Sequence, residues 1–119
     1  MTNRELLRNL YYELELLKLL REDNKGKETY VVANNRYVHV IEGWGLNGTE
    51  FNTICPLNAP RASIFYSITD AKERGFGYHF EDEPNNKEEL EIIKATEFYS
   101  YMIDETKDSI KVLEKELES

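Results

Sequence analysis

Two histidines and one cysteine are the side chains of this sequence best suited to metal binding or nucleophilic catalysis. His39 stands among apolar residues, His79 has no histidine or cysteine at helical or hairpin spacing, and Cys55 ends an apolar run. Metal sites typically use two ligands at a short, fixed spacing, and a nucleophile needs a base and an orienting carboxylate beside it. Neither pattern occurs around these three residues. We therefore expect no bound metal, no cofactor and no catalytic residue.

Three glycines, Gly43, Gly45 and Gly48, match the spacing Gly-x-Gly-x-x-Gly. In a dinucleotide site this motif precedes a helix whose N-terminal amides face a pyrophosphate. Here the residues that follow, 49–54, are typical of a strand. The glycines therefore predict a bend between two strands.

Aromatic side chains and arginines form a candidate ligand-binding group. Residues 30–80 hold more aromatic side chains than one small core requires, so some of them are expected at the surface. Exposed aromatic rings and guanidinium groups would stack on and clamp a nucleotide-like anion. Ordinary cross-strand pairing of the aromatics is the competing interpretation. The candidate ligand-binding residues are Arg36, Trp44, Arg61, Arg74 and Tyr78.

Carboxylates form the second candidate group. On a helix, carboxylates one turn apart recur about every 5.4 Å, so a row of them approximates the charge density of a nucleic acid backbone. Such a face would suit an inhibitor that occupies a nucleic-acid-binding cleft. Lysines in the same part of the chain also fit a solvated helix face with internal ion pairs. The candidate partner-binding acidic residues are Glu81, Asp82, Glu83, Asp104, Glu105 and Asp108.

Two amphipathic helices would carry or flank these groups. Leucines at three- and four-residue steps predict a helix over about residues 3–22, with Thr2 or Asn3 as its N-cap. A heptad-like pattern without glycine or proline predicts a second helix over about residues 86–118. At about 45 Å, that helix is longer than a domain of this size. We expect the overhang to be covered by the first helix or by a partner chain.

Between the helices, residues 29–80 predict a small antiparallel sheet. Two β-branched and aromatic runs around Asn34-Asn35-Arg36 predict a hairpin, because asparagine tolerates the positive φ of tight turns. A short helix is predicted over residues 69–75, with Thr69 or Asp70 as its cap. The predicted strands cover residues 29–33, 37–41, 51–55, 62–68 and 76–80.

Composition limits the classes of partner. The chain has 119 residues and a net charge of −8, which argues against direct binding to nucleic acid or to anionic membranes. No apolar run is long enough to cross a bilayer, and the first residues lead into an amphipathic stretch and not into a signal peptide. A single cysteine fits a reducing compartment. We expect one cytoplasmic domain over residues 1–119.

These observations predict an α+β fold in which a small antiparallel sheet of about four to five strands is flanked by an N-terminal helix and a long C-terminal helix. The leading functional hypothesis is a non-enzymatic interaction protein, a homodimer through its helices, that binds another protein. In general character the chain is similar to acidic phage-encoded proteins that inhibit host machinery, such as nucleic-acid-binding proteins. The alternative is a small-ligand, nucleotide-like binding protein that uses sheet aromatics and arginines.

Overall fold

The computed structural model describes residues 2–48, 50–57, 59–75 and 90–118 and confirms the α+β class. The chain divides into two compact units: a helical hairpin, from Met1–Lys25 and Thr96–Ser119, and a sheet unit, Gly26–Ala95. The elements are α1 (Asn3–Asn24), β1 (Tyr30–Ala33), β2 (Tyr37–Trp44), β3 (Glu50–Pro56), a 3-10 turn η1 (Ala59–Arg61), α2 (Ile68–Asp70), a π-helical turn η2 (Ala71–Gly75), β4 (Glu91–Lys94) and α4 (Ala95–Glu118).

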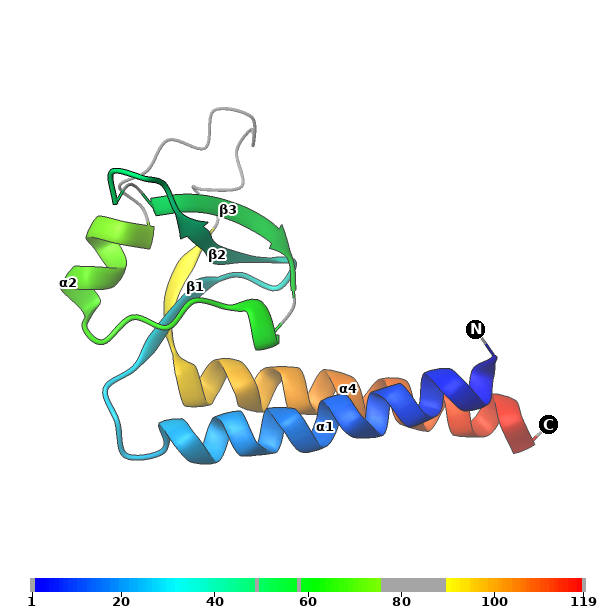
Figure 1. Cartoon of the computed structure of the whole chain (residues 1–119). Helices are drawn as coiled ribbons and strands as arrows, with labels where there is room; N and C mark the ends of the chain where they lie inside the picture. The colour runs from blue at the N-terminus through cyan, green and yellow to red at the C-terminus, as the bar shows by residue number, and fades with distance from the viewer. Residues whose placement is uncertain (1, 49, 58, 76–89, 119) are drawn as a thin grey trace. The chain divides into compact units, whose positions relative to one another are not determined.

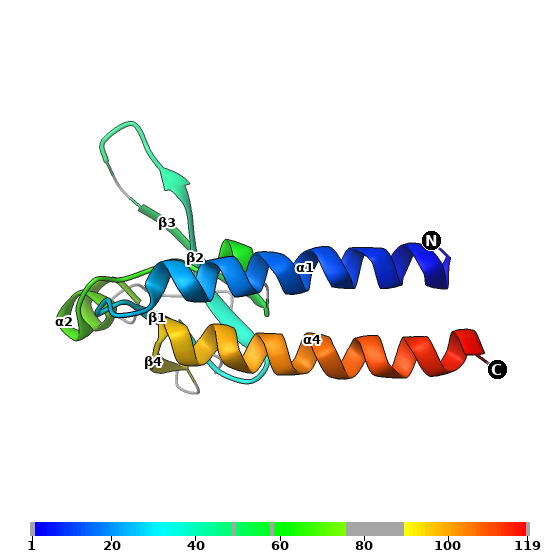
Figure 2. The same ribbon diagram turned by 90° about the horizontal axis from the view of Figure 1, so that it is seen from below.

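The helical hairpin consists of α1 and α4, which run antiparallel and side by side, with both chain termini at one end (Figures 1 and 2). Thr2 is the N-cap of α1, since its Oγ1 accepts a hydrogen bond of 3.2 Å from the Glu5 amide. The Tyr11 hydroxyl donates a hydrogen bond to the Glu114 carboxylate, which also raises the pKa of Tyr11. Early residues of α1 therefore lie beside late residues of α4.

The long C-terminal helix begins later than the sequence predicted. Residues 91–94 form β4, which pairs with β1 in the register Tyr30↔Lys94 and Val32↔Ile92. Isoleucine pairs of this kind suit a strand as well as a helix. Because an open edge of β1 is available, pairing prevails over helical periodicity for these residues. Residues 86–89 lie outside the described residues.

The sheet has the strand order β3-β2-β1-β4, and all its pairings are antiparallel. Asn34 shapes the predicted hairpin turn, because its Oδ1 accepts hydrogen bonds of 2.7 Å from the amides of both Arg36 and Tyr37. Gly45 and Gly48 lie between β2 and β3, as expected, whereas Gly43 lies within β2 and pairs with Phe51 at an irregularity in the strand register. Gly48 has φ = 79°, a conformation that favours glycine.

The segment predicted as a strand over residues 62–68 is not a strand of the sheet. It forms one isolated bridge, in which Phe65 exchanges two backbone hydrogen bonds of 2.8 Å with Tyr30. Ser63 bonds β2 instead: its amide donates to the His39 carbonyl at 3.3 Å, and its Oγ accepts from the Ile41 amide at 2.6 Å. The segment therefore fills the place where β1 and β2 diverge. The predicted strand over 76–80 lies outside the described residues.

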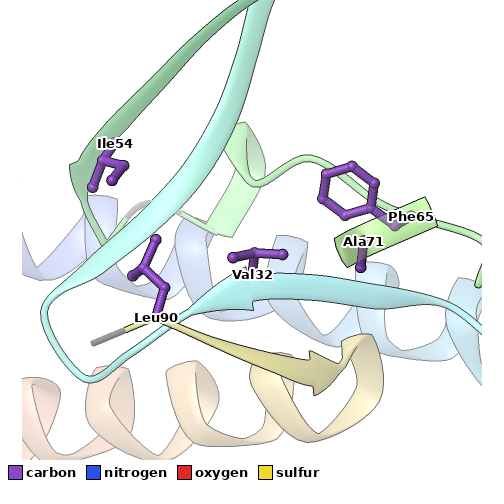
Figure 3. Packing of buried hydrophobic residues seen from close by; sticks show 5 residues of the cluster. All are labelled: Val32, Ile54, Phe65, Ala71 and Leu90. Atoms are coloured by element: carbon purple, nitrogen blue, oxygen red, sulfur yellow. The ribbon is translucent and has the colours of Figure 1, made fainter. Parts of the chain in front are cut away.

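The short helix predicted over residues 69–75 is present as α2 and η2, and its cap is Ser67, whose Oγ accepts from the Asp70 amide at 2.9 Å. One face of the sheet buries an apolar cluster against this segment. Figure 3 shows Val32 of β1 between two pairs of residues, with Phe65 and Ala71 on one side and Ile54 and Leu90 on the other. The cluster consists of Val32, Ile54, Phe65, Ala71 and Leu90.

Candidate docking site on the helical hairpin

A solvent-open groove runs between α1 and α4 and has a volume of about 420 Å³. Its apolar surface comes from two leucines of α1 and from Val112 and Leu113 of α4. We call it the acidic groove, because its charged lining residues are all carboxylates. Its lining residues are Leu6, Leu10, Glu105, Asp108, Ser109, Val112, Leu113 and Glu116.

The groove lies where the apolar residues of both helices become exposed to solvent. On α1, Leu17 is fully buried and Leu10 is half-buried, whereas Leu6 is 40% exposed. On α4, Ile103 and Ile110 are buried, whereas Leu117, seven residues further along the same face, is 40% exposed. Exposure therefore rises toward the end of the hairpin that holds both termini. Exposed apolar side chains of this size gathered in a concave site are typical of a docking surface.

The spacing of the α4 residues explains why they share this site. Glu105, Asp108, Val112 and Glu116 are separated by three or four residues, which places them on one side of a helix. Two of the predicted acidic residues, Glu105 and Asp108, therefore line the groove together. The candidate set predicted from the sequence did not include Glu116 or the apolar floor. Continuation of this spacing past Asp108 would have pointed to Val112 and Glu116.

The other predicted acidic residues are not in the groove. Asp104 is exposed on α4, but the next residue along a helix points about 100° away, and Asp104 is not among the lining residues. Glu81, Asp82 and Glu83 lie outside the described residues.

The structure distributes the predicted ligand-binding residues along the sheet unit. Arg36 is exposed in the turn before β2, while the Trp44 backbone ends β2 opposite Glu50. At about 3.3 Å per residue, these two ends of β2 are roughly 25 Å apart. Arg61 is exposed at the end of η1, and Tyr78 lies outside the described residues.

Arg74, the remaining candidate, is held by two carboxylates. Its Nε and Nη2 donate to Glu50 Oε1 at 2.9 and 2.6 Å, and its Nη1 lies 3.2 Å from Asp70 Oδ2. The guanidinium also stands 5.6 Å from the ring centre of Phe65. Because Glu50 and Asp70 neutralise it, Arg74 stabilises the sheet unit in place of offering a charge to an anionic ligand. Arg36 and Arg74 therefore do not form one clamp, since Glu50 holds Arg74 at the far end of β2.

His39 is fully buried beside this ion pair. Its ring stacks on Phe65 with the centres 5.5 Å apart, and its Nε2 lies 2.6 Å from Asn52 Oδ1. Burial lowers the pKa of His39, and the Asn52 contact opposes that shift. The environment therefore favours a neutral imidazole within a packed aromatic cluster.

Within the described ranges, no group of three or more His, Cys, Asp or Glu side chains is arranged to hold a metal ion. Cys55 lies in β3 with a partly exposed side chain. No helix in these ranges has the length and apolar character that crossing a membrane requires.

Comparison with known proteins identifies no relative: no family model, curated protein or solved structure matches the chain. The acidic groove is therefore the feature that points to a function.

Proposed function

We propose that this chain is a non-enzymatic protein-interaction module whose acidic groove binds a cationic amphipathic helix of another protein. The observation that carries the proposal is the pairing of an exposed apolar floor with a wholly acidic set of charged lining residues. A helix in a groove of this kind presents apolar anchors to the floor and basic side chains to the edges.

Charge complementarity selects the class of partner. Glu105, Asp108 and Glu116 contribute three carboxylates around the groove, and the whole chain carries a net charge of −8. A basic helix gains from these charges, whereas an acidic helix with the same apolar face meets repulsion. Basic amphipathic helices are common in proteins that bind nucleic acid. The proposal therefore agrees with a role as an inhibitor that competes with nucleic acid for such a helix.

The test uses two designed peptides of equal length and apolar pattern, one built from leucine and lysine and the other from leucine and glutamate. Fluorescence anisotropy should detect binding of the labelled Leu/Lys peptide and none of the Leu/Glu peptide. Equal binding of both peptides would show that charge does not select the partner.

Charge reversal within the groove supplies the sharper comparison. Glu105→Lys with Asp108→Lys changes the net charge by +4, two sites at +2 each, and should weaken Leu/Lys binding about tenfold or more. Asp104→Lys with Glu118→Lys makes the same +4 change at two exposed α4 residues that do not line the groove. This control should bind within about twofold of the wild type. Equal losses of peptide affinity in both variants would show that net charge determines binding, and would contradict binding in the acidic groove.

The small-ligand hypothesis predicts the reverse ranking. In that case the groove variants would leave binding unchanged, nucleotides would raise the melting temperature of the wild type, and Arg61→Ala would abolish that increase. A nucleotide-dependent increase that Arg61→Ala abolishes would therefore replace the proposal with the ligand-binding alternative.

A further inference from the structure

A second apolar surface lies on α1, away from the acidic groove. Tyr12, Leu16 and Leu19 are 71%, 41% and 65% exposed. Their spacing of four and then three residues places them in one stripe, which we call the outer strip. At about 100° per residue, Tyr12 and Leu6 are separated by roughly 120° around the helix. The outer strip and the groove therefore occupy different sides of α1.

Charged residues beside the outer strip differ between its two ends. Arg8 is exposed near the start of α1, and Glu15 and Glu22 follow at seven-residue intervals on the same edge. Seven residues correspond to nearly two full turns, so the three side chains form one line. This edge is basic at its first position and acidic at its last.

The basic end of this edge can pair with the acidic end of the same edge in a second copy only when the two helices run antiparallel. We propose that the outer strip is the interface of a homodimer, in which α1 packs antiparallel against α1 of a second copy about a two-fold axis near Leu16. Tyr12 then packs on Leu19 of the second copy, and Arg8 faces Glu22 of the second copy. Glu15 lies at the axis beside its own copy, where Lys18, whose Nζ is 3.5 Å from Glu15 Oε1 in the same helix, offsets its charge. The contacts of Tyr12 and Arg8 are the ones that set the antiparallel direction. Each of these contacts occurs twice, as two-fold symmetry requires.

The parallel arrangement is disfavoured by the residues in line with the strip. Glu5 and Asp23 continue the outer strip at its two ends, seven residues before Tyr12 and seven after Leu16. In a parallel pair each of these carboxylates would meet its own copy, and like charges in contact are unfavourable. In the antiparallel pair Asp23 lies instead near Arg8 of the second copy.

The interface is small, because three apolar side chains per copy contribute to it. Interfaces below about 1,200 Å² in total are typical of weak, reversible association. We therefore expect a dimer that dissociates on dilution into the low micromolar range. The groove stays open in the dimer, so that each dimer presents two acidic grooves and gains avidity for a partner with two basic helices.

Sedimentation equilibrium over low to several hundred micromolar protein tests the inference. The wild type should shift from monomer to dimer, and Leu16→Glu with Leu19→Glu should remain monomeric while keeping the wild-type circular dichroism spectrum, since both side chains are exposed. This variant should also bind the Leu/Lys peptide as the wild type does. A wild type that is monomeric throughout, or a variant that still dimerises, would overturn the homodimer.

The antiparallel arrangement has its own test. Arg8→Glu should weaken dimerisation because it places two carboxylates together, and Arg8→Glu with Glu22→Arg should restore it by exchanging the two charges. Failure of the double variant to recover would overturn the antiparallel arrangement. Neither outcome depends on the acidic groove, because peptide binding is measured separately.

Discussion

Phe65 joins two kinds of interaction in the sheet unit. His39 stacks on the Phe65 ring, and the Arg74 guanidinium lies over the same ring. The Phe65 backbone is hydrogen-bonded to Tyr30. Glu50 then fixes Arg74 by two hydrogen bonds to one carboxylate oxygen. His39, Glu50 and Arg74 are thus used in packing and ion pairing within the sheet unit.

The protonation of His39 should make stability depend on pH. Because burial lowers its folded-state pKa below the ordinary value of 6.5, the unfolded chain binds a proton that the folded chain does not. The stability contribution is therefore full above about pH 6.5 and falls as the pH drops from there toward the folded-state pKa. Thermal unfolding of the wild type and of His39→Gln should show a steeper loss in the wild type between pH 7.5 and 5.5. Parallel curves would contradict this.

Removing Arg74 should destabilise the sheet unit. Arg74→Met leaves Glu50, whose side chain is 13% exposed, without its cation, and the loss of a charged hydrogen bond of this kind costs about 2 kcal/mol. Arg74→Lys should lose less, because it keeps the charge and gives up the two-donor geometry. Urea unfolding measures both. Wild-type stability of Arg74→Met would show that the ion pair contributes nothing.

At the scale of elements, the sequence predicted structure that depends on neighbouring residues better than structure that depends on distant parts of the chain. The hairpin turn was predictable because Asn34 bonds residues two and three positions ahead. By contrast, β4 depends on pairing with β1 about sixty positions earlier in the chain, and the position of the segment around Phe65 depends on its bridge to Tyr30 of β1. Neither partner is visible in a local pattern.

The candidate site divides in the same way. Glu105 and Asp108 were predicted from their spacing within one helix, and the structure places both in the groove. The contribution of Leu6 and Leu10 was not predictable, because it depends on the antiparallel register of α1 against α4. That register becomes evident only from contacts between the helices, such as Arg21 Nη1 to Ser100 Oγ at 3.3 Å.

Substitutions at buried and at groove positions of α4 should have different effects, the first on stability and the second on peptide binding. Ile103 is 1% exposed, so Ile103→Ala should lower the free energy of unfolding by about 2–4 kcal/mol through the cavity it leaves. Val112→Ala removes apolar surface from an exposed site and should change stability by less than about 0.5 kcal/mol, while weakening Leu/Lys peptide binding. Chemical denaturation and anisotropy measure the two effects. Equal destabilisation by both variants would contradict the assignment of Val112 to an open groove.

At the scale of the whole molecule, the net charge of −8 adds a long-range component to the proposed recognition. Attraction between the acidic chain and a basic helix is screened beyond about 8 Å at physiological ionic strength. Binding of the Leu/Lys peptide should therefore weaken as salt increases, chiefly through a slower association rate. Stopped-flow fluorescence at several salt concentrations measures this rate. A rate that does not change with salt would contradict electrostatic steering.

The most direct test of the proposed function maps which residues of the protein contact the Leu/Lys peptide. It follows the backbone amide chemical shifts of the ¹⁵N-labelled protein during titration with the peptide. We expect the largest changes at residues 6–10 of α1 and 105–116 of α4, with small changes over residues 30–56. Changes centred on the sheet unit, around Arg36 or Arg61, or on the outer strip with no response in the acidic groove, would contradict the proposed function.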